Sequence, residues 1–179
     1  MKRLLSLLAI PVLLALVVTP ALAQSLLPIT TDLIADGRGD APDVGDLSVA
    51  ADGTVTFQID EAATDWLLDE THLYVGDEAP SKSAPGKFNY KSEELGGVAA
   101  VTYDVDLAAA DENGDGIVYI AAHAALIMEA GIDPDTGEML YETESAWAQG
   151  DEAIGKGKNW ATCFAVDLAA EATADVTVE

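Results

Sequence analysis

The sequence predicts an all-β protein, an antiparallel β-sandwich of the jelly-roll or immunoglobulin-like kind in a single domain. Short runs rich in β-branched and aromatic residues recur along the chain, and clusters of Gly, Pro, Asn and Asp separate them. About seven such runs at spacings of roughly 8 to 12 residues are typical of an antiparallel sandwich or barrel. No strong amphipathic helix competes with this interpretation, because the apolar residues alternate rather than recur every three or four positions.

The first residues have the pattern of a secretory signal peptide. Lys2 and Arg3 precede an apolar run of 15 residues, 4–18, and Ala21-Leu22-Ala23 has the small-x-small pattern of a cleavage site. A membrane-spanning helix needs roughly 20 apolar residues. We therefore expect cleavage after Ala23, a secreted, extracellular protein and no membrane insertion.

The charge balance narrows the classes of partner. Removing Lys2 and Arg3 leaves 6 basic residues against 32 acidic ones, a formal net charge of −26. Such a surface repels phosphate backbones and anionic lipid headgroups, and it attracts cations. The charge disfavours nucleic-acid and membrane binding. A need for solubility alone would also explain this excess of acidic residues.

The domain organisation follows from composition. We predict a signal peptide over 1–23, an N-terminal segment over 24–46, the β-sandwich domain over 47–168 and an acidic tail over 169–179. The N-terminal segment is rich in Asp, Gly and Pro, and we expect one short strand in it, at 26–33. The tail is too small and too acidic in composition to predict a regular element there.

The clearest hairpin opens the predicted domain. Strands 47–50 and 54–59 flank Asp52-Gly53, a dipeptide that favours a tight β-turn. Strict alternation predicts one buried face for the second strand, formed by Val55, Phe57 and Ile59.

A longer strand is predicted over 66–75. Period-two alternation places Trp66, Leu68, Glu70, His72 and Tyr74 on one face of it. Frequent Gly and Pro residues then predict a long ordered loop over 76–97.

The next two strands are predicted as a second hairpin. Residues 98–107 alternate between apolar and polar positions, and residues 117–126 begin with the β-branched and aromatic run from Ile117 to Ile120. Residues 108–116 are predicted to connect them. Loops are predicted at 128–142 and 150–159, and a last strand at 160–168.

Cys163 is the single cysteine of the chain, so no internal disulfide forms. Its neighbours Trp160, Thr162, Phe164 and Val166 alternate as in a strand. We therefore predict a packed thiol rather than a nucleophile.

A polar group is predicted where the two histidines of the chain meet. His72 and His123 lie on predicted neighbouring strands, and Glu70 and Glu144 are expected beside them. Two imidazoles and two carboxylates suit zinc or another transition metal. The same residues also fit a buried hydrogen-bond network that pins a loop to the sheet, or acid–base catalysis by a neutral imidazole beside a carboxylate.

A second candidate site lies between the predicted strands at 98–107 and 117–126. Asp111, Asn113 and Asp115 place oxygen atoms at alternate positions before Gly116, as at the start of a calcium-binding loop. The twelfth position is Ala122 instead of the bidentate glutamate of a helix-flanked site. The remaining hypotheses are a calcium site on a β-loop, completed by the Ile117 carbonyl, and a turn that needs Gly for its backbone geometry.

Five motifs resemble, in order, those of a recurrent and functionally uncharacterised domain family of secreted and cell-surface bacterial proteins. They are ETHLYVG at 70–76, PGKFNY at 85–90, VYIAAHA at 118–124, ESAWAQG at 144–150 and NWATCF at 159–164. The resemblance covers most of 44–164 and implies a compact extracellular β-domain, without supplying catalytic residues. The chain departs from the family pattern at Ser145, at Cys163 and in having no appended modules.

The function we predict is that of a non-catalytic β-sandwich module with a structural or binding role at the cell surface, stabilised by calcium. Its partner would be an extracellular ligand or glycan. Two alternatives stay open. One is a metal-dependent hydrolase or lyase centred on His72 and His123, and the other is a carbohydrate-binding module that uses Trp66, Trp147 or Trp160.

Overall fold

The computed structural model describes residues 24–35, 41–155 and 160–168, and in these ranges the protein is all-β, as predicted. A short 3-10 turn, η1 (Pro85–Lys87), and one helical turn, α1 (Leu107–Ala110), interrupt the strands. The strands are β1 (Gln24–Leu26), β2 (Ile29–Ala35), β3 (Asp43–Val49), β4 (Thr54–Ile59), β5 (Leu67–Gly76), β6 (Tyr90–Ser92), β7 (Ala100–Asp104), β8 (Ile117–Ile132), β9 (Met139–Ala148), β10 (Glu152–Ala153) and β11 (Thr162–Asp167).

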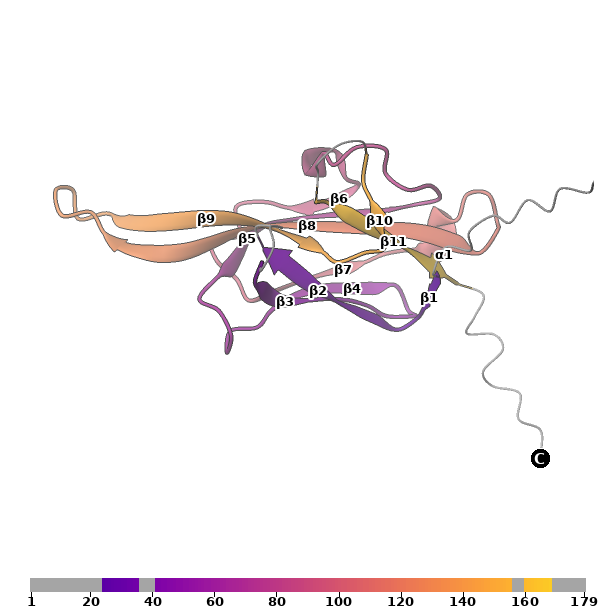
Figure 1. The fold of residues 1–179 in the computed structure, drawn as a ribbon, viewed down its shortest axis with the longest axis horizontal. Coiled ribbons are helices and arrows are strands. Elements are labelled where there is room, and N and C mark those ends of the chain that lie inside the picture. Colours follow the sequence, from indigo (N-terminus) through magenta and orange to yellow (C-terminus); the bar gives the residue numbers. More distant parts are fainter. Residues whose placement is uncertain (1–23, 36–40, 156–159, 169–179) are drawn as a thin grey trace, which may run out of the picture.

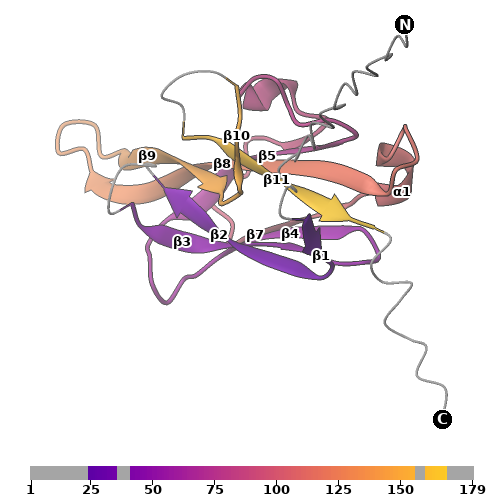
Figure 2. The same ribbon diagram turned by 45° about the vertical axis from the view of Figure 1, so that its right-hand side comes forward.

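The described strands form one sheet that is nearly closed into a barrel (Figures 1 and 2). The order of neighbours is β1-β11-β8-β9-β2-β3-β4-β7, and β5 pairs with the other edge of β8. Apart from the parallel β1–β11 pair, these pairings are antiparallel. Two backbone hydrogen bonds between Leu68 and Val98, of 2.9 and 3.0 Å, bring the ends of the sheet together.

The finer prediction of a two-sheet sandwich is not confirmed. The strand that changes the architecture is β8, which is 16 residues long. Along one edge it pairs first with β11 and then with β9, and along the other edge it pairs with β5. Because one long strand joins these neighbours, the sheet curves around a single interior instead of dividing into two layers.

The interior contains the main core. In the predicted first hairpin, β3 and β4 pair as expected, and Val55, Phe57 and Ile59 are buried while the residues between them are not. Each such side chain contributes about 1.5–3 kcal/mol of burial free energy. The largest fully buried side chains of this core besides these are Leu33, Leu47, Leu68, Leu73, Ile120 and Leu126.

The N-terminal segment lies within the sheet instead of preceding it. β2 is placed between β9 and β3, and its Leu33 and Ala35 are fully buried. The sequence analysis missed the strand that begins at Asp43, because the Asp, Gly and Pro residues of 36–46 are typical of a loop. Gly45 is one of them, yet it belongs to β3 and pairs with Ile59.

Two predictions for the middle of the chain are wrong. β7 pairs with β4 and not with β8, so residues 98–126 form no hairpin. Residues 128–142 are not a loop, because β8 continues to Ile132 and β9 begins at Met139. The two strands form a long hairpin whose end projects beyond the rest of the sheet (Figure 1).

A second, smaller cluster packs on the outer face of the sheet. It contains Phe88 and Trp147, with Ala121, Ile154, Ala161 and Cys163, and Tyr74 and Trp160 pack against it. Residues of the loop after β5 and of the segment around β10 therefore cover this part of β5, β8 and β9. The two histidines lie beside this cluster.

Candidate functional site

His72 and His123 face each other across the β5–β8 pair. They are direct register partners, and their Nδ1 atoms are 3.3 Å apart. His72 is buried, and the ring of His123 packs edge-on against Trp147 with ring centroids 5.0 Å apart. Neighbouring strands thus bring the two imidazoles within hydrogen-bond distance on the outer face of the sheet.

Two carboxylates lie at the other nitrogen of His72. Nε2 is 3.8 Å from Glu70 Oε2 and 3.8 Å from Glu93 Oε1, and Lys91 Nζ donates to the same Glu93 oxygen at 3.2 Å. The two Nδ1 atoms share one hydrogen bond, and the tautomers of the two rings decide which nitrogen donates.

Burial, together with the neighbouring His72 ring, lowers the pKa of His123 from 6.5 to about 4. His123 is therefore neutral at neutral pH. A neutral imidazole held by a neighbour and an indole ring acts as a fixed polar contact between two strands.

Glu144, the fourth predicted member, does not join this group. Its register partner is Leu126, a core residue, whereas the register partner of His123 is Trp147. Side chains alternate along a strand, so Glu144 points to the face opposite the histidines. Its Oε1 instead accepts a hydrogen bond from the Ser145 backbone at 2.8 Å.

Glu93 is the member that sequence reasoning missed. It follows β6, in which Lys91 pairs with His72. Glu93 comes close to His72 only because β6 pairs with β5 over three residues. A strand of three residues is too short to show alternation in the sequence. With Glu93 in place of Glu144, the group consists of His72, His123, Glu70 and Glu93.

The geometry of this group suits a structural contact. The facing Nδ1 atoms supply two ligands, and the carboxylates lie at Nε2, on the other side of the His72 ring. Within the described residues, no cluster of three or more His, Cys, Asp and Glu side chains is arranged to hold a metal ion. A hydrogen-bonded pair of one buried and one partly buried imidazole stabilises the pairing of β5 with β8.

The predicted calcium loop is a compact turn before β8. Asp111 accepts backbone hydrogen bonds from Gly114 and Asp115 through Oδ1 and from Gly116 through Oδ2, at 2.9–3.1 Å. Asn113 Oδ1 accepts from the Asp115 backbone, and Asp115 Oδ1 accepts from Ile117 N. The predicted ligands Asp111, Asn113, Asp115 and Ile117 thus lie in one turn, and calcium binding there stays a prediction.

Cys163 and the tryptophans are packing residues. Cys163 is buried in β11, and its burial, with the nearby Glu152, raises the pKa of the thiol to about 11. Trp147 is buried, and Trp66 and Trp160 are partly buried. Sugar binding by these tryptophans stays a prediction.

The projecting hairpin carries a feature that the sequence analysis missed. Large apolar side chains at its end are exposed: Ile132 by 64%, Met139 by 39%, Leu140 by 45% and Tyr141 by 55%. In the described part of the chain these are the exposed large hydrophobic residues, and they gather at one place. A cluster of this kind marks a contact surface more often than a scattered apolar residue does.

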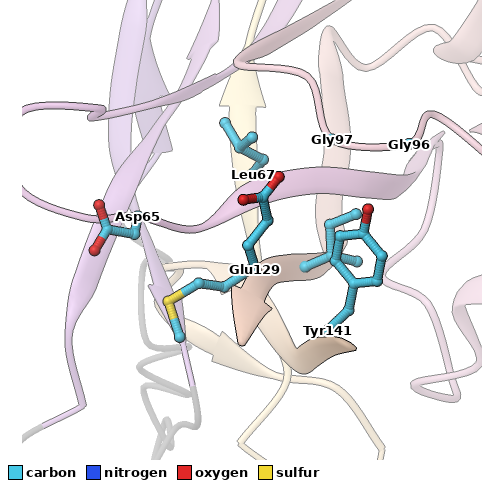
Figure 3. Close-up of a pocket in the computed structure, with 8 residues that line it drawn as sticks. Asp65, Leu67, Gly96, Gly97, Glu129 and Tyr141 are labelled. Carbon is cyan, nitrogen blue, oxygen red and sulfur yellow. The ribbon is translucent and has the colours of Figure 1, made fainter. Parts of the chain in front are cut away.

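A pocket of about 410 Å³ lies at the base of this hairpin (Figure 3). Leu67, Ile127 and Met128 give it an apolar wall, and Tyr141 closes one side. In Figure 3 the carboxylate of Glu129 lies between Asp65 and Tyr141. Gly96 and Gly97 complete the lining. The pocket therefore combines apolar surface with two carboxylates and a phenol.

Comparisons with protein-family models, with curated proteins and with solved structures find no match for this chain. The resemblance to the family of secreted bacterial domains therefore stays a prediction. In the described residues, no helix has the length and apolar character needed to cross a membrane.

Proposed function

We propose that the protein is a secreted, non-catalytic binding module and that the β8–β9 hairpin, with the pocket at its base, is its contact surface. One observation carries the proposal. Ile132, Met139, Leu140 and Tyr141 expose apolar surface together at the end of the hairpin. Leaving such side chains in water forgoes burial free energy, which a partner restores when it covers them.

The charge around the hairpin indicates the chemistry of the partner. Between Lys91 and Lys156 the chain contains no Lys or Arg. The hairpin itself carries several carboxylates: Glu129, Asp133, Asp135, Glu138, Glu142 and Glu144. A partner with apolar and basic groups side by side complements this surface, and nucleic acids and anionic membranes do not.

The pocket fits the same chemistry. Asp65 and Glu129 attract a cationic group, while Leu67 and Ile127 offer apolar surface to an aliphatic stem. Lys and Arg side chains combine these two properties. The pocket therefore suits a basic side chain of the partner.

Photo-crosslinking tests the proposal. A photoreactive residue is placed at Leu140 or, as a control, at the exposed Glu112, in the segment between α1 and β8. Figure 1 shows α1 at the opposite end of the molecule from the projecting hairpin. The protein is then incubated with the extracellular fraction of its source cells. We expect a discrete crosslink from Leu140 that excess unlabelled protein suppresses. The variant I132S/L140S/Y141S, added in the same excess, should leave it intact.

Two results would contradict the proposal. One is equal competition by the triple variant and the unchanged protein. The other is a crosslinking pattern from Glu112 that matches the pattern from Leu140.

A further inference from the structure

We propose that residues 139–145 of β9 bind an extended segment of a partner protein as an added β-strand. The inference rests on the proposed function, because it specifies how the hairpin makes its contact. Strand addition uses backbone hydrogen bonds for affinity and alternate side chains for selectivity.

Among the residues that the structure describes, none pairs with the outer edge of β9 over 139–145. On its inner side, β9 pairs with β8 along the whole hairpin, from Ile132 with Met139 to His123 with Trp147. On its outer side, β2 pairs with residues 146–148 alone. In the described parts of the chain, no strand pairs with the outer edge of 139–145, so alternate N–H and C=O groups there face outward.

The other edge of the hairpin is a poorer template. β5 pairs with β8 as far as Ile127, and it does not reach the same edge of β8 beyond that residue. The register of β8 shifts between Glu129 and Gly131, and Gly131 has a φ of +118°. Such a bulge interrupts the row of donors and acceptors and twists the edge, which protects it from pairing. The shift lies on the β8 side of the pair, and residues 139–145 of β9 follow one another without a bulge.

The side chains of β9 specify the occupant. Met139, Tyr141 and Thr143 lie on one face, and Leu140, Glu142 and Glu144 lie on the other. A paired strand with apolar residues at every second position would cover Met139 and Tyr141, while basic residues between them would meet Glu142 and Glu144. We therefore infer an extended segment in which apolar and basic residues alternate.

A second copy of the chain is a poor occupant. The protein has a net charge of −24, and two copies of this edge would place Glu142 and Glu144 near their counterparts. Like charges directly opposite each other across a strand pair are destabilising. The charge of the edge thus favours a different, basic partner.

Hydrogen–deuterium exchange with a synthetic peptide tests the inference. The probe is acetyl-Lys-Val-Lys-Val-Lys-Val-Lys-amide, and two control peptides accompany it: one with Glu in place of Lys, and one N-methylated at alternate residues. The N-methylated peptide keeps the charge and the side chains but loses the donors that strand pairing needs. We expect the basic peptide to slow exchange over residues 139–145, and neither control to do so.

A charge reversal gives a second measurement. We expect Glu142→Lys to weaken binding of the basic peptide about tenfold, as the loss of a facing charge pair should. The matched variant Glu112→Lys changes the net charge equally at the other end of the molecule, and it should change the affinity less than twofold.

The outcomes separate this inference from the proposed function. Equal binding of the N-methylated and unmodified peptides would overturn strand addition, as would the absence of protection over 139–145. If Leu140 nevertheless gives its competed crosslink, the hairpin is a contact surface that acts through side chains alone. If the crosslink fails as well, both proposals fall.

Discussion

The His123 side chain illustrates how one partly buried imidazole makes stability depend on pH. Its pKa is about 4 in the folded protein, against 6.5 for an unburied histidine. The titratable groups nearest to it are the His72 ring and, beyond that ring, Glu70 and Glu93. The unfolded chain binds the proton more strongly, so the associated stability is complete above pH 6.5 and is lost as the pH falls towards 4.

This pKa difference predicts a loss of about 2.5 kcal/mol in the free energy of unfolding between pH 7 and pH 4.5. Carboxylates titrate in the same range, so the informative quantity is the difference between the protein and its His123→Gln variant. Urea unfolding at both pH values measures it. We expect the variant to lose about 2.5 kcal/mol less than the protein. Parallel curves for the two proteins would show that His123 is not held neutral by the fold.

Gly45 is a position where a single methyl group should not fit. Its φ is +155°, and a Cβ atom there would lie 2.1 Å from the Gln58 carbonyl oxygen and 2.8 Å from Ile59 Cα. Both contacts are with backbone of the paired strand, which cannot move without breaking the β3–β4 ladder. We expect Gly45→Ala to lower the free energy of unfolding by about 3 kcal/mol or more.

Gly114 provides the matched control for this substitution. It also has a positive φ, of +74°, but a Cβ atom there would meet nothing within 4 Å. Gly114→Ala should therefore cost about 1–2 kcal/mol, the conformational term alone. Equal losses for the two variants in urea unfolding would mean that the close approach at Gly45 has no energetic consequence.

The turn before β8 is the element on which the calcium prediction depends. Its hydrogen bonds use both lone pairs of Asp111 Oδ1 but only one on Asp111 Oδ2, Asn113 Oδ1 and Asp115 Oδ1. Oxygen atoms with a remaining lone pair are the ligands that calcium takes. We expect millimolar calcium to raise the melting temperature and the Asp115→Asn variant to lose most of the rise. The neighbouring Glu112→Gln should retain it, and an unchanged melting temperature of the protein itself would end the prediction.

The end of the β8–β9 hairpin should matter little for stability. Leu140 is 45% exposed, whereas Leu126 of the same hairpin is fully buried in the core. We expect Leu140→Ser to change the free energy of unfolding by about 0.5 kcal/mol or less, and Leu126→Ala to lower it by about 2–5 kcal/mol. Chemical denaturation measures both. A large loss from Leu140→Ser would show that this side chain supports the fold and is not held available for a partner.

The sequence predicted elements where burial is one-sided. β4 alternates Val55, Phe57 and Ile59 with polar residues because one face lies in the core. The outer half of β9 has both faces exposed, so no alternation marked it. The turn signal at Asp133-Pro134-Asp135-Thr136-Gly137, flanked by Ile132 and by Met139 and Leu140, was present and is typical of a hairpin.

The histidine pair could be anticipated, and its companions could not. Two strands that pair in register bring His72 opposite His123. Which side of the sheet the adjacent residues face depends on local bulges. A register shift between Leu68 and Glu70 turns Leu68 into the core, although strict alternation places it on the face of His72. Such a bulge leaves no mark in the apolar pattern.

At the scale of the whole molecule, the ends of the nearly closed sheet meet through contacts that are distant in sequence. The Leu68–Val98 bridge joins β5 to the residues before β7, and β4 pairs with β7 across the intervening strands β5 and β6. A periodic pattern predicts that a strand exists but not which strand lies beside it. The change from the predicted sandwich to one nearly closed sheet follows from this limit.

The net charge of −24 acts on the molecule as a whole and makes a last prediction. Carboxylates spread over the surface repel one another in the compact state, and basic residues are too few to pair with them. Salt shortens the range of this repulsion from about 30 Å at 0.01 M to a few ångströms near 1 M. We expect the melting temperature to rise by about 3–6 °C between 10 mM and 500 mM NaCl, which corresponds to about 1–2 kcal/mol.

Calorimetry in a calcium-free buffer separates this screening from site binding. Screening depends on ionic strength, so NaCl and KCl at equal concentration should act alike, whereas the turn at Asp111 should respond to calcium in a constant background of 500 mM NaCl. A melting temperature that does not rise with NaCl would mean that the carboxylates repel one another as strongly in the unfolded chain as in the barrel. The acidic surface would then not lower the free energy of unfolding, so the protein could attract a basic partner to the hairpin without losing stability.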